Sequence, residues 1–191
     1  MVASKENRAL AAYLKSTLGV SSPIIRKYWD EENKSGIDIL GMDDAPVKGF
    51  STHATIGVSD YSIGLQVDDV PLGVEFLIAG GSLFGDPANM IATCAFNVIN
   101  TKMAVQPGTI FRSVVEMYRP GGELRHILFV PPTWWEMQTQ EFSAKKVAWL
   151  QAIPISDQEA RFADKSGTDA LEELFEARQV DTLNLDRSSI V

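Results

Sequence analysis

The stretch that decides the fold of this chain is VAWLQAIPISDQE, residues 147–159. Residues 147–155 are almost entirely apolar and predict a strand that ends at Pro154 and Ile155. Ser156 and Glu159 then have the spacing of a capping box, in which a hydroxyl and a carboxylate each accept a hydrogen bond from a free backbone N–H of a starting helix. The stretch therefore predicts a buried strand followed directly by a capped helix, and it contains no catalytic pattern.

A second, acidic helix is predicted after this one. Gly167 breaks the first helix, and Thr168 is placed to cap the next. Leu171, Leu174 and Phe175 recur on one face of that helix, which we expect to point inward. The opposite face is acidic and consists of Asp169, Glu172, Glu173 and Glu176. Such a face is usually plain solvated surface.

The remaining chain mixes helices and strands. Helical patterns cover residues 4–18, which begin with a capping serine, and the segment that starts at Asp86 and Pro87, an N-cap followed by a pre-organised first residue. Clusters of β-branched and aromatic residues predict strands at 51–58 and 72–79, and a hairpin at 109–118 and 124–130. These elements predict an α+β fold with a mixed, largely antiparallel sheet covered by helices. At this length we expect a single domain over residues 1–191.

The composition is that of an acidic globular protein. The 191 residues carry a formal net charge of −8, and 45% of them are hydrophobic. No apolar run approaches the roughly 20 residues needed to cross a bilayer, and the N-terminal residues lack an apolar signal core, so we expect a cytoplasmic protein. The negative charge argues against direct nucleic-acid binding and favours a basic protein partner.

Residues that could support catalysis or bind a metal are few. His53 and His126 each lie within a strand pattern and lack the ligand spacing of a zinc site. Cys94 lies on the apolar side of a helix, where a thiolate is unfavourable. The glycine-rich segment 80–87 lacks the P-loop and dinucleotide-binding patterns, and Asp86 would repel a phosphate. We therefore expect no cofactor, no metal and no enzymatic activity.

Exposed aromatic side chains beside carboxylates are the candidate partner-binding residues. Trp134 and Trp135 either fill the core, which is the favoured interpretation, or anchor a partner. Trp29 precedes three acidic residues, a pattern that suits a basic protein surface as well as a solvated loop. If the acidic residues converge on one side, they form a negative patch that steers a cationic partner. The acidic candidates are Asp30, Glu31, Glu32, Asp43, Asp44, Asp68 and Asp69.

Short motifs along the chain carry a family resemblance. They are THATIGVS at 52–59, Glu75, Pro107-Gly108, IPI at 153–155 with Glu159 and Gly167, and Asp186-Arg187-Ser188. Their order and spacing resemble the suppressor-of-fused-like domain family, whose members bind proteins. The resemblance implies that its family-defining positions maintain the fold, while partner contacts lie in variable loops. Those positions are Thr55, Gly57, Glu75, Pro154, Glu159, Asp186 and Arg187.

Bacterial single-domain members of this size are similar to YqcF-type antitoxins. The resemblance implies a bacterial immunity protein of a toxin–antitoxin system, which binds and neutralises a secreted nuclease toxin of the LXG type. The expected partner is then a basic toxin, bound tightly and in a salt-sensitive manner, without a membrane or a nucleic acid.

Two alternatives remain open. An adapter could capture an extended peptide by strand addition, with main-chain hydrogen bonds supplying much of the affinity, and acidic surface residues would then matter little. An enzyme would require turnover that depends on His53, His126 or Cys94.

Overall fold

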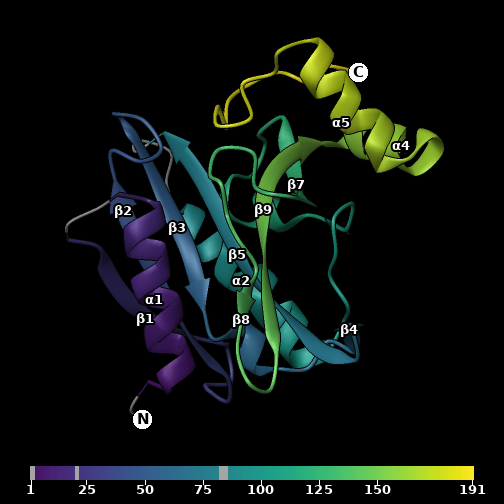
Figure 1. Ribbon diagram of the computed structural model, residues 1–191. Coiled ribbons are helices and arrows are strands. Elements are labelled where there is room, and N and C mark those ends of the chain that lie inside the picture. The colour runs from purple at the N-terminus through teal and green to yellow at the C-terminus, as the bar shows by residue number, and fades with distance from the viewer. Residues whose placement is uncertain (1–2, 20–21, 82–85) are drawn as a thin grey trace.

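The chain forms a mixed sheet with helices on both faces (Figure 1). The computed structural model describes residues 3–19, 22–81 and 86–191. The helices in these ranges are α1 (Lys5–Thr17), α2 (Pro87–Thr101), α3 (Val114–Tyr118), α4 (Asp157–Ser166) and α5 (Thr168–Ala177), with a 3-10 turn η1 (Val58–Asp60). The strands are β1 (Ile24–Trp29), β2 (Gly36–Asp43), β3 (Phe50–Ile56), β4 (Leu65–Val67), β5 (Val70–Gly81), β6 (Ile110–Phe111), β7 (Leu124–Val130), β8 (Gln140–Glu141) and β9 (Lys146–Ser156).

The strands follow the order β1-β2-β3-β5-β9-β7-β6, with β4 added beside β5 and β8 beside β9. The β5–β9 pair is parallel, and the other strand pairs in the described ranges are antiparallel. The α+β prediction, with a largely antiparallel sheet covered by helices, is confirmed. No helix in these ranges is long and apolar enough to span a membrane.

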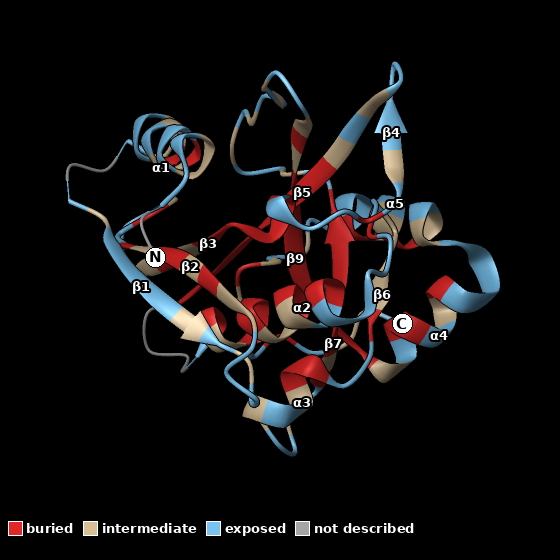
Figure 2. Cartoon of the chain, turned by 90° about the horizontal axis from the view of Figure 1, so that it is seen from below, coloured by how far each residue is buried: buried red, intermediate tan, exposed pale blue. Residues whose placement is uncertain are grey.

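Helices cover both faces of the sheet, with α2 and α3 on one face and α1, α4 and α5 on the other. Side chains alternate between the faces along β2, so that Ile37 and Ile39 pack in the cluster under α2, whereas Leu40 and Met42 pack in the cluster under α1. This is the two-residue period of a strand buried on both faces. Figure 2 shows buried residues concentrated along β5, β9 and α2, while β1 at the sheet edge is mostly exposed.

The predicted opening and closing helices are confirmed. The Ser4 hydroxyl accepts a hydrogen bond from the backbone N–H of Asn7 at the start of α1, and Gly19 follows the helix with a φ of 69°. At the start of α4, Ser156 and Glu159 form both hydrogen bonds of the predicted capping box. Pro154 lies inside β9 where only β7 pairs with it, because the pairing with β5 ends at Gln151.

The buried carboxylate of Glu75 connects three elements. Its oxygens accept hydrogen bonds from the hydroxyls of Thr55 and Ser59 and from the backbone N–H groups of Gly57, Val58 and Ser59, at 2.7–3.3 Å. Burial raises the pKa of Glu75, and hydrogen bonds from Thr55, Gly57 and Ser59 act in the opposite direction. Glu75 therefore ties β3 and η1 to β5.

A second buried carboxylate fixes the segment that follows α5. Glu159 accepts hydrogen bonds from both terminal nitrogens of Arg187, at 2.5 and 2.9 Å, and from the backbone N–H of Ile190 at 3.1 Å. Arg187 also donates to the carbonyl oxygen of Pro154 at 3.0 Å and lies over the ring of Phe175. This clamp holds the segment against β9 and α4.

Part of the hairpin prediction is wrong. β6 pairs antiparallel with β7 as expected, but residues 114–118 form helix α3 rather than a strand. Ser113 adopts a left-handed conformation, with a φ of 59°, that turns the chain. Val114 and Val115 are then buried against the central cluster, so that tertiary packing overrides their β propensity.

Other local predictions need correction. Strands β1 and β2 were not predicted from the sequence, and Trp29 and Asp43 lie at their ends. Asp86 precedes α2 but makes no capping hydrogen bond through its side chain, and Gly167 rather than Thr168 is the N-cap of α5. Residues 82–85 of the glycine-rich segment lie outside the described residues.

The Glu75 site predicts a large stability loss on truncation. Glu75→Ala removes the acceptor for three backbone N–H groups and two hydroxyls in a dry site, so we expect the free energy of unfolding in urea to fall by roughly 3 to 5 kcal/mol. The exposed control Glu31→Ala should stay within about 0.5 kcal/mol of the parent. A loss under about 1 kcal/mol for Glu75→Ala would contradict this role.

The clamp predicts a contrast between two arginine–carboxylate pairs. Arg187→Ala leaves Glu159 as an unpaired buried charge and should lower the free energy of unfolding by about 3 to 5 kcal/mol. Arg112→Ala removes an exposed pair with Asp164 and should cost about 1 kcal/mol or less. Chemical denaturation of both variants measures the contrast, and equal losses would show that burial of the Arg187 pair has no special role.

Candidate functional site

The acidic helix α5 forms one wall of a surface groove. This groove has a volume of about 790 Å³, and we call it the α5 groove. Its opposite wall is the loop after β7, and β7 and β9 contribute Val130 and Ile153 to its lining. Figure 1 shows α4 and α5 together at one end of the sheet. The principal side chains of the groove are Trp134, Phe175, Val180, Asp169, Glu172, Glu173 and Glu176.

The two adjacent tryptophans separate in the structure. Trp134 is 44% exposed in the α5 groove, and its indole nitrogen lies 3.5 Å from the hydroxyl of Thr182. Trp135 is partly buried against the cluster under α1. Core packing, the favoured interpretation for both residues, therefore applies to Trp135 and is wrong for Trp134.

Four carboxylates follow one side of α5 at positions i, i+3, i+4 and i+7. In the described part of the chain, no lysine, arginine or histidine forms an ion pair with them. Burial raises the pKa of Glu172, and the nearby charge of Asp169 adds to this effect. The i, i+3, i+4, i+7 spacing is readable from the sequence, but the groove beside it is not. The sequence alone therefore predicts only an ordinary solvated surface for these residues.

A second groove lies between the β1–β2 hairpin and helices α2 and α3. This hairpin groove has a volume of about 810 Å³ and contains Trp29, Asp30, Glu31 and Glu32. The structure thus places these four candidates together. Trp29 is 50% exposed, and the Lys27 ammonium lies 5.5 Å from the centre of its ring.

The hairpin carboxylates are partly engaged in local contacts. Asp30 accepts hydrogen bonds from the backbone N–H groups of Lys34 and Ser35, at 2.7 and 3.2 Å. Although desolvation acts to raise it, the pKa of Asp30 is lowered by these hydrogen bonds. Glu32 forms an ion pair with Lys34. Because Lys34 and Arg112 also line the hairpin groove, its charge is mixed.

The other acidic candidates do not join these grooves. Asp43 and the β1–β2 turn lie at opposite ends of β2, which are about 23 Å apart. The Asp44 carboxylate accepts a hydrogen bond from the backbone N–H of Gly49, at 2.8 Å. Asp68 and Asp69 form the β4–β5 turn, where Asp68 pairs with Lys146 at 2.8 Å. The predicted acidic residues therefore do not converge into one patch.

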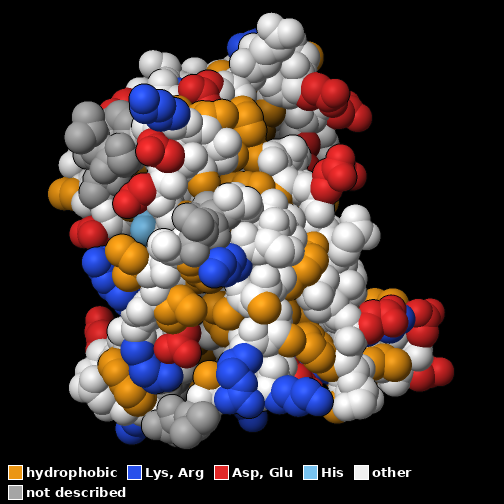
Figure 3. Space-filling model, turned by 60° about the vertical axis from the view of Figure 1, so that its left-hand side comes forward, with side chains coloured by type: hydrophobic (Ala, Val, Ile, Leu, Met, Phe, Trp, Pro, Cys, Tyr) orange, Lys and Arg blue, Asp and Glu red, His pale blue; other side chains and the backbone are white. Residues whose placement is uncertain are grey.

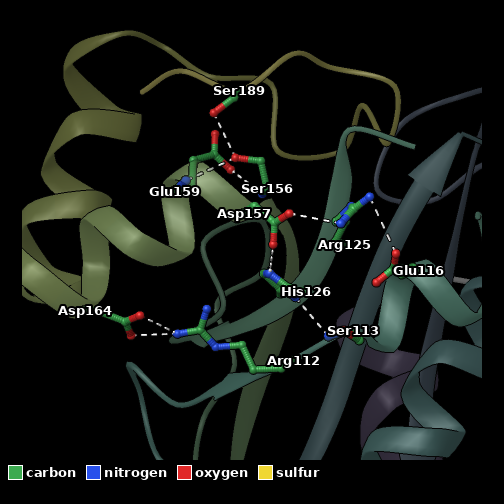
Figure 4. A network of polar contacts seen from close by, with 10 residues as sticks. All are labelled: Arg112, Ser113, Glu116, Arg125, His126, Ser156, Asp157, Glu159, Asp164 and Ser189. Atoms are coloured by element: carbon green, nitrogen blue, oxygen red, sulfur yellow. Dashed lines mark hydrogen bonds and ion pairs between the residues drawn. The ribbon is translucent and has the colours of Figure 1, made fainter. Parts of the chain in front are cut away.

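His126 occupies a structural position (Figure 4). Its Nδ1 accepts a hydrogen bond from the backbone N–H of Ser113, and its Nε2 lies 2.8 Å from the Asp157 carboxylate. Arg125 donates to the other oxygen of Asp157 at 3.0 Å. Since both ring nitrogens are engaged and the residue is 4% exposed, His126 is not placed to exchange protons with a substrate.

The other candidates for catalysis or metal binding are Cys94 and His53. Cys94 is buried, and burial raises the pKa of its thiol. Burial lowers the pKa of His53, which lies on β3 beside Gly41. Within residues 3–19, 22–81 and 86–191, no cluster of histidine, cysteine and carboxylate side chains could hold a metal ion.

Comparisons with known proteins point to one family. The family model described as Suppressor of fused protein (SUFU) matches residues 33–188. The chain is 40% identical over 193 residues to Immunity protein YqcF of Bacillus subtilis (strain 168), and the match covers 100% of both chains.

Solved structures show the same fold at low sequence identity. A suppressor of fused homologue from Neisseria gonorrhoeae FA 1090 matches with a TM-score of 0.71 and 18% identity, covering 97% of this chain and 96% of that one. A Sufu–Fu complex matches at 0.68 and 14% identity, covering 95% and 91%. Drosophila Suppressor of Fused matches at 0.65 and 14% identity, covering 96% of this chain and 49% of that one.

The His126–Asp157 contact predicts an acid-sensitive contribution to stability. The hydrogen bond with His126 lowers the pKa of Asp157, so its carboxylate stabilises the fold above the ordinary carboxyl pKa and loses this effect as the pH falls through the lowered value. Asp157→Asn should therefore melt below the parent at about pH 6, and the difference should shrink towards about pH 3. A difference that stays constant over this range, measured by thermal denaturation, would contradict the assignment.

Proposed function

Because this chain belongs to the suppressor of fused family, we propose that it acts as an immunity protein that binds a toxin and blocks its activity. The observation that carries the proposal is the match to Immunity protein YqcF, at 40% identity over the full length of both chains. A match of that extent spans the core, the clamp and both grooves, which supports a common fold over the whole length of the two proteins. The proposed role is stoichiometric binding in the cytoplasm, without turnover.

We further propose that the toxin is a secreted nuclease of the LXG type. Nucleases present cationic surfaces to phosphates, and this chain has a formal net charge of −8. Opposite charges accelerate association and favour the correct partner. The α5 groove and the hairpin groove each combine an exposed tryptophan with carboxylates, the chemistry expected of a surface for a basic protein. These features support a toxin-binding role.

A second candidate function is capture of an extended peptide by strand addition. The observation in its favour is the sheet edge at β1, which pairs only with β2 in the described part of the chain. Ile24 and Ile25 on this strand are 54% and 50% exposed. Figure 3 shows the side of the molecule that carries β1, where hydrophobic patches alternate with acidic and basic side chains. An added strand would gain main-chain hydrogen bonds there.

The immunity role predicts inhibition of a nuclease in a stoichiometric complex. The tagged protein would be used to capture its partner from native cells, and the nuclease activity of the purified partner would be measured with and without added protein. We expect complete inhibition at equal concentrations and association that slows by roughly tenfold or more at high salt. An unrelated nuclease, used as the control, should stay active.

Variants at the sheet edge separate the two candidate functions. Ile24→Asp and Ile25→Asp alter exposed side chains, so the fold should persist, but strand addition at β1 should be lost. Inhibition that survives both changes supports immunity through another surface. A captured partner that lacks nuclease activity and binds through a short segment sensitive to these changes would establish the adapter function instead.

A further inference from the structure

The carboxylate row on α5 is unfavourable for the isolated fold. Asp169, Glu172, Glu173 and Glu176 lie within about 10 Å along one side of the helix, and like charges at i, i+3 and i+4 repel. No cation of the described chain forms an ion pair with them. Asp169 lies in the first turn of α5, where the helix dipole favours a negative charge, but the dipole does not favour Glu176 at the other end of the row. A cationic partner would relieve the remaining repulsion.

The surface beside the row is apolar. Trp134 exposes 44% of its area across the groove from α5. Phe175 also lines the groove but is only 6% exposed, and the Arg187 guanidinium lies 5.1 Å from the centre of its ring. Val180, just after α5, extends this apolar area. The clamp described above holds the α5 side of this surface in place. An apolar side chain of a partner would therefore contact Trp134 and Val180 beside the row of α5 carboxylates.

We propose that the α5 groove docks a cationic segment of a protein partner, with lysine or arginine residues along one face and an apolar side chain inserted against Trp134. This inference rests on the proposed immunity function in one respect, because it takes the toxin as the source of the segment. The four carboxylates match several cations held in line, rather than one compact ion. A nucleic acid would be repelled by the same row.

The test uses a defined probe. A synthetic 15-residue helical peptide carries lysines at i, i+3, i+4 and i+7 and one leucine on the adjoining face, and its binding to the full chain is measured by calorimetry at low salt. Glu172→Gln, Glu173→Gln and Glu176→Gln combined should weaken binding by about tenfold or more. Binding of the peptide to the parent protein should also change its tryptophan fluorescence. Trp134→Ala should weaken peptide binding and remove this fluorescence change.

The control keeps the net charge equal. Asp43→Asn, Asp69→Asn and Glu123→Gln combined remove three exposed carboxylates outside the α5 groove, and peptide binding should stay within about twofold of the parent. The α5 triple variant should melt at or above the temperature of the parent, because repulsion has been removed, so lost binding cannot reflect unfolding. Equal weakening by both triple variants would overturn the proposal, as would binding unaffected by the α5 changes.

Further arms identify the occupant and separate this inference from the immunity function. A peptide with glutamates in place of the lysines should not bind. Spermine, a small polycation, should not displace the lysine peptide at equal concentration. Displacement by spermine would overturn the assignment of a protein segment as the occupant. If the α5 triple variant inhibits the toxin like the parent, the groove assignment fails and immunity stands. If the parent inhibits no nuclease but binds the peptide as expected, immunity fails and the groove assignment stands.

Discussion

The buried ion pair between Glu159 and Arg187 is the interaction on which the arrangement of this molecule depends. Glu159 belongs to the capping box that starts α4, and it also accepts hydrogen bonds from both terminal nitrogens of Arg187. One carboxylate thus joins the end of β9, the start of α4 and the segment after α5. Arg187 in turn covers the ring of Phe175, so the pair sets the position of α5 and with it one wall of the α5 groove.

Glu75 is a second buried carboxylate that joins separate elements, at another place in the sheet. In both cases a carboxylate is withdrawn from water and surrounded by donors from segments that are distant in sequence. Unpaired, each would be strongly unfavourable, so the surrounding backbone has little freedom to rearrange. Burial of this kind gives Glu75, Glu159 and Arg187 a structural role in the fold. These three residues do not line the α5 groove or the hairpin groove.

Local patterns made much of this fold predictable. The capping serines, the apolar runs of β5 and β9 and the helical period of α2 all agree with the structure. The helix at residues 114–118 was mistaken for a strand because its valines owe their conformation to burial against distant residues. The separation of Trp134 from Trp135, and the groove beside the α5 carboxylates, depend on how the loop after β7 packs. Neither feature can be predicted from the spacing of neighbouring residues in the sequence.

The parallel pairing of β5 with β9 also has a kinetic consequence. The two strands at the centre of the sheet are joined by a connection that contains α2, β6, α3, β7 and β8. That long loop must close before the central contacts form, and domains dominated by such non-local pairings fold slowly compared with helical bundles. For a protein proposed to neutralise a toxin, protection begins only when folding is complete. In the proposed role, the sheet topology would therefore delay toxin binding after synthesis by at least the folding time of the chain.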